Sequence, residues 1–172
     1  GCTDNTFEVV SAIAESDNRI KPIYIEFGDK ANAWNVYVDR LAPDNADMHI
    51  FMDGDVKPAD KAFHEIQESM KKHPEALVFS TLPRGGRQSE SWAKRILVNH
   101  GMPGNLYGVP KEAFLRLRDI PVRLPIGLVG DDPLLRFLFL RNLDPTTPKK
   151  LDYIRPVETS FFEYESIPAK SL

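Results

Sequence analysis

The sequence predicts an α/β fold: a mainly parallel (mixed) sheet with helices on both faces. Two observations lead to this fold class. Short apolar runs typical of buried strands alternate with segments of helical periodicity, which is the pattern of a layered α/β protein. The chain has 172 residues, 42% hydrophobic and 27% charged, which suits one globular domain with a sizeable core. We therefore expect a single domain over residues 1–172.

The first half of the chain opens with a helix over residues 2–16, where polar residues able to cap a helix precede an apolar face. An apolar run over 21–27 predicts a strand, and apolar residues at helical spacing predict a helix over 29–42. The run "MHIFM", residues 48–52, predicts a buried strand. The next helix is expected to begin at Pro58, because proline suits a first helical turn, and to end at residue 73.

The second half continues the alternation. Strands are expected where β-branched and aromatic residues run together, at 75–82, 105–109 and 151–167, the last as one or two strands. Helices are expected where apolar residues recur every three or four positions, at 91–100, 110–119 and 131–143. The last of these carries acidic residues and Pro133 in its first turn, where the helix dipole favours negative charge.

Composition narrows the partners and the setting. Lys and Arg number 22 against 25 Asp and Glu, so the net charge is −3, and nucleic acid is not expected as a partner. Cys2 is the only cysteine, which excludes an internal disulfide framework and a thiolate zinc cluster. We expect a cytoplasmic protein, with peripheral attachment to a membrane left open.

An acidic pair, Asp53 and Asp55, follows the strand over 48–52 with only Gly54 between. Open α/β sheets bind ligands beyond the carboxyl ends of their strands, which is where this pair falls. Two oxygen donors at one point suit Mg²⁺ or Mn²⁺. An ordinary Asp-Gly turn is the competing interpretation, although a surface turn needs no buried strand leading into it.

A second acidic pair, Asp131 and Asp132, opens the helix over 131–143. The structural interpretation is capping of the helix and compensation of its dipole. The functional interpretation makes Asp132 a general base with Asp131 as its neighbouring carboxylate.

Two families contain such pairs. The order of "IFMDGDV", "LVFSTL", Lys94 or Arg95 and "GDD" resembles the haloacid-dehalogenase-like phosphatases, which depend on Mg²⁺. The resemblance departs from that family at Lys57, which stands where threonine or valine is usual. It also departs in order, because other elements precede this strand.

The second resemblance covers most of the chain. The segments "GCTDNT", "GDKANAWN", "IFMDGDVKP", "PGNLYGVPKEAF" and "GDDPLLRFL" resemble, in order, motifs of the family 2 glycosyltransferases, which have the GT-A fold. Each motif alone is weak, but their shared order favours this family over the phosphatase. The resemblance implies transfer of a sugar from a nucleotide-diphospho-sugar, with uridine as the commonest base, to an acceptor hydroxyl.

The resemblance also implies roles for the donor-side residues. Asp55 would bind Mn²⁺ or Mg²⁺, and Asp53 would contact the metal or the ribose. Lys30 and Asn35 would lie near the nucleotide. A solvated lysine at the start of a helix is an equally open interpretation of Lys30, and for Asn35 a packing role within the helix is favoured over the functional one.

On the acceptor side, the resemblance makes Asp132 the base that activates the acceptor hydroxyl, supported by Asp131. Acceptor contacts would come from Asn105, Tyr107 and Arg136, although Arg136 could instead pair with Asp132 one turn away. In-line attack would invert the anomeric carbon. The acceptor, whether glycan, lipid or small molecule, is not specified by these motifs.

In this family a strand, a helix and a second strand precede the position that corresponds to Gly1. We therefore expect a domain that is incomplete at its N-terminus and that binds nucleotide weakly or not at all, because its base pocket is incomplete. A degenerate nucleotide-sugar-binding module without transfer activity is the non-enzymatic alternative.

Overall fold

The computed structural model describes residues 2–86 and 88–164. By its internal contacts the chain forms two compact units. The smaller unit comprises Gly1–Ala42 and Val122–Val129, and the larger comprises Pro43–Pro121 and Gly130–Leu172. None of the described helices has the length and apolar character needed to cross a membrane.

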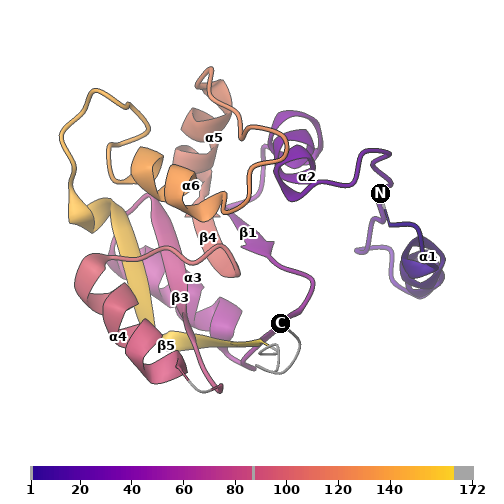
Figure 1. The fold of residues 1–172 in the computed structure, drawn as a ribbon, viewed down its shortest axis with the longest axis horizontal. Coiled ribbons are helices and arrows are strands. Elements are labelled where there is room, and N and C mark those ends of the chain that lie inside the picture. The colour runs from indigo at the N-terminus through magenta and orange to yellow at the C-terminus, as the bar shows by residue number, and fades with distance from the viewer. Residues whose placement is uncertain (1, 87, 165–172) are drawn as a thin grey trace. The chain divides into compact units, whose positions relative to one another are not determined.

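The larger unit is built on a mixed five-stranded sheet, which Figure 1 shows with its helices. In spatial order its strands are β1 (Met48–Met52), β4 (Leu106–Pro110), β3 (Val78–Pro83), β5 (Ile154–Tyr164) and β2 (Val56–Pro58). The expected mixed α/β class is thus observed. Every residue of β3 is buried, as expected for a strand covered on both faces.

The pairing within this sheet differs from the mainly parallel arrangement that the sequence predicted. Only β3 and β5 pair in parallel among the described strands, whereas β1–β4, β3–β4 and β2–β5 are antiparallel. The alternation of strands and helices did orient β1 and β3 the same way. However, β4 lies between them and runs in the opposite direction, so each pairs with β4 and not with the other.

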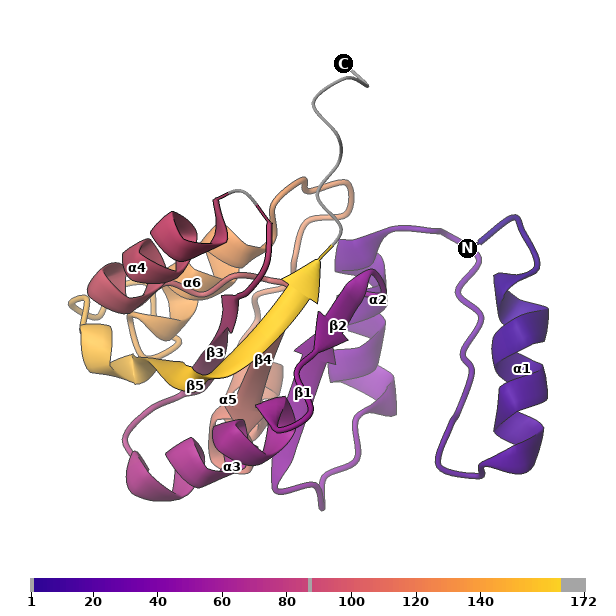
Figure 2. The ribbon, with the colours of Figure 1, turned by 90° about the horizontal axis from the view of Figure 1, so that it is seen from below.

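Helices cover both faces of the sheet, as predicted. Phe79 of β3 packs with Ile66 of α3 (Ala62–Lys72). The next residue, Ser80, points to the other face and donates a hydrogen bond to the Gly101 carbonyl (2.7 Å), just beyond α4 (Ser89–Asn99). Figure 2 shows α3 on one side of the strands and α4 with α6 (Asp132–Phe139) on the other.

The helix α5 (Lys111–Asp119) packs on β1 through aromatic contacts. The ring of His49, which is only 3% exposed, stacks on Phe114 with centroids 3.6 Å apart. Burial of the imidazole lowers the pKa of His49, and the positive charge of Arg118 lowers it further. His49 therefore belongs to the core in its neutral form.

The smaller unit contains α1 (Thr6–Ser16) and α2 (Lys30–Val36), which continues as a π-helical turn over Tyr37–Leu41. Both helices were predicted. Asp4 accepts a hydrogen bond from the Thr6 N–H (3.1 Å) just before α1. Asp29 caps α2 by accepting from the Asn32 N–H (2.7 Å).

Two sequence predictions about local structure were wrong. Residues 21–27 form no strand, because no other described strand pairs with them and an extended segment needs such a neighbour. Pro58 does not open α3 but ends the short strand β2, opposite Phe162. Because β2 is an edge strand, the missing N–H of a proline is tolerated there.

Candidate functional site

The first acidic pair lies where the sequence placed it, directly after β1. The Asp53 N–H donates to the Asn105 carbonyl (2.9 Å), and the Asn105 side-chain amide approaches Asp53 Oδ2 (3.4 Å). The Val56 N–H in turn donates to the Asp53 carbonyl (3.3 Å), which closes a tight turn through Gly54. Asp53 is thereby fixed at the end of the sheet, next to one of the predicted acceptor residues.

Asp55, on the exposed side of this turn, lines a hollow of about 540 Å³. We call it the Asp55 hollow; its lining residues are Gly54, Asp55, Val56, Lys57, Glu163 and Tyr164. The contribution of Glu163 and Tyr164 was not predicted. It arises because β5 pairs with β2 and sets Tyr164 opposite Val56, a long-range pairing that no local sequence pattern reveals.

The second acidic pair opens α6, with Pro133 in its first turn as predicted. Asp131 is buried (5% exposed), and its carbonyl accepts the first helical hydrogen bond from the Leu135 N–H (3.1 Å). The side chain of Asp131 does not cap the helix, so the predicted capping role is not observed. Asp132 is the first residue of the helix.

Asp132 lines a smaller hollow of about 300 Å³ on the face of the sheet that α4 covers. We call it the Asp132 hollow; its lining residues are Trp92, Arg95, Ile96, Gly101, Met102, Pro103 and Asp132. The sequence could have indicated that Trp92 and Arg95 line the same site, since residues three apart on a helix share a face.

Two features connect these hollows. Pro103 lines the Asp132 hollow, and Asn105, two residues further along the same segment, contacts Asp53. Two residues of chain span at most about 7 Å, so this hollow lies close to Asp53. Independently, the ring of Trp92, from the Asp132 hollow, packs edge-to-face on Tyr164, from the Asp55 hollow, with centroids 5.6 Å apart. The two acidic pairs, far apart in sequence, thus lie in neighbouring parts of one unit.

Two predicted acceptor residues have other surroundings. Tyr107 is 2% exposed and stacks on Phe51 with centroids 4.9 Å apart, so it belongs to the core and lacks the exposure that acceptor contact needs. Arg136 does not pair with Asp132. Its guanidinium donates to the carbonyls of Asn99 (2.6 Å) and His100 (3.2 Å), because the last carbonyls of α4 lack helical partners.

The two predicted nucleotide residues of α2, Lys30 and Asn35, belong to the smaller unit. Lys30 is the exposed first residue of that helix. The Asn35 amide makes a double contact with Leu124, donating to its carbonyl (2.9 Å) and accepting from its N–H (3.0 Å). Asn35 therefore has a structural task, which agrees with the packing interpretation of this residue.

Within the described residues, no group of three or more His, Cys, Asp or Glu side chains is arranged to hold a metal ion. A carboxylate pair such as Asp53 and Asp55 still suits Mg²⁺ or Mn²⁺, since these ions commonly bind one or two carboxylates and take their remaining ligands from substrate phosphates and water. The residues present fit a metal that arrives with a phosphorylated ligand.

Comparison with known proteins identifies a family. The model of glycosyl transferase family 2 matches residues 1–130, which include both members of the first acidic pair and end just before Asp131. No curated protein matches the chain. The match gives no support to the phosphatase interpretation. Because it covers well over half of the chain, the protein belongs to glycosyl transferase family 2.

Proposed function

We propose that this glycosyltransferase uses a divalent ion, Mn²⁺ or Mg²⁺, to transfer a sugar from a uridine-diphosphate sugar to an acceptor hydroxyl, with inversion. One observation carries the proposal: one member of each acidic pair, Asp55 and Asp132, lines a hollow, and the Trp92–Tyr164 contact joins the two hollows. Such an arrangement allows one pair to serve the donor diphosphate and the other to serve the acceptor.

Asp55 and Asp53 are the residues that would hold the ion. The Asp53 carboxylate is oriented by Asn105, whereas Asp55 is exposed and open to a ligand. When bound, the ion supplies Lewis-acid stabilisation of the charge that grows on the departing diphosphate. Lys57, which also lines the Asp55 hollow, adds a positive charge that attracts the donor phosphates.

Asp132 is the proposed general base. Its carboxylate takes the proton from the acceptor hydroxyl while the hydroxyl oxygen attacks the anomeric carbon of the donor sugar. The bond from that carbon to the phosphate oxygen breaks, and its electron pair leaves with the diphosphate. Attack from the face opposite the leaving group inverts the carbon. Asp131, buried and bonded through its carbonyl to Leu135, holds Asp132 at the start of α6.

The test is release of uridine diphosphate from UDP-glucose, UDP-galactose and UDP-N-acetylglucosamine at millimolar concentration with Mn²⁺, water serving as a slow acceptor. We expect release from at least one donor, and an Asp132→Asn variant should lower the rate by roughly 10²–10⁴-fold, the usual contribution of a general base. The matched control is Asp152→Asn, at an exposed aspartate outside both hollows.

Two outcomes would overturn the proposal. Equal rates in the Asp132→Asn and Asp152→Asn variants would remove Asp132 from the chemistry. Donor binding with no release from any donor would instead favour the degenerate binding module.

A further inference from the structure

The Asp132 hollow contains two opposite charges that do not neutralise each other. Arg95 and Asp132 both line it, yet neither side chain makes an ion pair or hydrogen bond within residues 2–86 and 88–164. Two such groups facing one space, without contact, leave room for a ligand between them. The chemical class of this ligand follows from the two charges and from the proposed function. The inference therefore rests on the proposed function.

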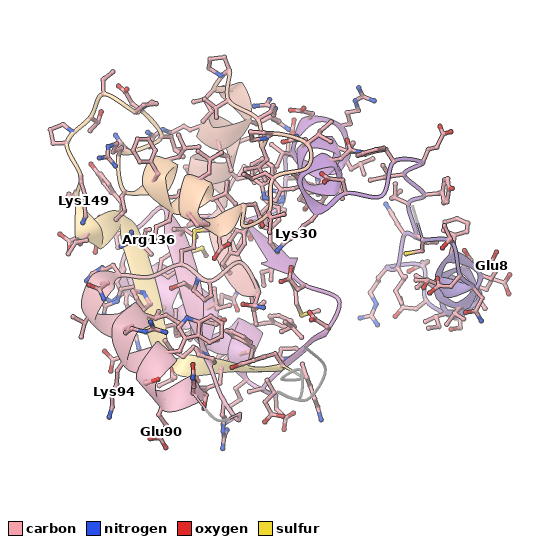
Figure 3. All side chains as sticks on the ribbon, in the orientation of Figure 1. Glu8, Lys30, Glu90, Lys94, Arg136 and Lys149 are labelled. Carbon is pink, nitrogen blue, oxygen red and sulfur yellow. The ribbon has the colours of Figure 1, made fainter. Side chains whose placement is uncertain are left out.

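The geometry of α4 directs Arg95 into this space. Trp92, Arg95 and Ile96 stand three and four residues apart, so they share one face of the helix. Ile96 is buried at 3% exposure and Trp92 is half-buried, which fixes that face toward the sheet. Lys94 lies on a different face; Figure 3 shows it on the outer side of α4, directed away from the sheet.

Arg95 is also the arginine available at this place. Arg136 follows Asp132 by one helical turn, but its guanidinium already donates to the carbonyls of Asn99 and His100. An arginine without a protein partner presents a planar set of donors that matches the two oxygens of a carboxylate or phosphate.

We propose that the Asp132 hollow binds an acidic sugar as the acceptor. Arg95 binds the anionic oxygen group, carboxylate or phosphate, while a hydroxyl of the same sugar faces Asp132. The volume of about 300 Å³ lies at the lower end for small-molecule sites, so the hollow admits a monosaccharide-sized group. Arg95 thus determines specificity, and Asp132 remains the base.

The experiment is an NMR titration of the ¹⁵N-labelled protein with three probes: D-glucuronate, D-glucose 6-phosphate and neutral D-glucose. Backbone amide shifts of Gly101 and Met102, which line the hollow, report binding. We expect at least one acid to bind about tenfold more tightly than glucose. The two acids distinguish a carboxylate from a phosphate as the recognised group.

Variants test the role of Arg95. Arg95→Ala should abolish the preference for the acid, Arg95→Lys should retain part of it, and Lys94→Ala should leave it unchanged. Because Arg95 and Lys94 are both exposed on α4, neither change should disturb the fold, which the same spectra verify. Equal binding of glucose, a preference that survives Arg95→Ala, or no binding by either acid would each overturn the inference.

The wild-type sample also separates this inference from the proposed function, through a titration with uridine diphosphate and Mg²⁺. Metal-dependent nucleotide binding without a preference for the acids would overturn the acceptor assignment alone. Absence of nucleotide binding would count against the proposed function itself.

Discussion

Gly108 occupies the centre of β4, where replacement by alanine tests how closely the sheet packs against α3. The residue pairs with Ile50 on one side and Phe79 on the other. A Cβ atom added here would lie 2.9 Å from Ile66 Cγ2 and 2.9 Å from Met48 Sδ, closer than carbon and sulfur atoms normally approach. The added methyl group must therefore displace its neighbours.

The cost depends on which neighbour can move. Met48 is flexible and only half-buried, but Ile66 is fully buried and β-branched, so its methyl group has little freedom. Overpacking of this kind costs about 1–3 kcal/mol. A loss of about 2 kcal/mol would lower the Tm of a chain of this size by roughly 4–8 °C.

The assay is urea denaturation of Gly108→Ala, with a lower midpoint and an unchanged m-value expected. Gly54→Ala is the control, because nothing lies within 4 Å of its added Cβ, and its stability should stay within about 1 kcal/mol of wild type. Ile66→Leu removes the β-branch methyl, so Gly108→Ala should cost less in that background. A Gly108→Ala protein as stable as wild type would refute the close packing of β4 against α3.

Two further predictions concern residues that support the fold around the site. Because burial lowers the pKa of His49 in the folded chain, the unfolded chain binds more protons in acid, and stability should decline as the pH falls below about 6.5. Urea midpoints at pH 7.5 and 5.5 measure this decline; a His49→Gln variant with the same decline would contradict the assignment. Arg136→Ala should cost about 1 kcal/mol, because the end of α4 loses its guanidinium donor, and Arg136→Lys should cost less. An unchanged urea midpoint in Arg136→Ala would argue against a stabilising role for the hydrogen bonds from Arg136 of α6 to the end of α4.

The sequence predicted best where local pattern and packing agree. The strand "MHIFM" was placed at Met48–Met52 because an apolar run ends there at a pair of aspartates. α6 was recognised from Pro133 and the acidic residues at its start: Asp132 and Pro133 lie in the first turn, and Asp131 is the residue that precedes the helix. The position of Asp53 and Asp55 beyond a strand end followed from the same reasoning.

The sequence predicted least where contacts are distant in the chain. Nothing local indicates that β4 would insert between β1 and β3, or that β5 would bring Tyr164 to the Asp55 hollow. Arg136 illustrates the same limit: its spacing suggested a pair with Asp132, but unsatisfied carbonyls at the end of a neighbouring helix compete for it. Tyr107 was predicted as an acceptor contact because its segment resembles a family motif, but the sheet buries its ring.

Paramagnetic broadening by Mn²⁺ is a sensitive test of the proposed metal-dependent donor site, since it reports even weak binding. Amide signals of the ¹⁵N-labelled protein are recorded with substoichiometric Mn²⁺, with and without uridine diphosphate. We predict that the nucleotide increases broadening at Gly54, Asp55 and Val56, and that Asp55→Asn abolishes this increase. Broadening that is the same with and without the nucleotide, or that persists unchanged in Asp55→Asn, would contradict the proposed metal-dependent donor site.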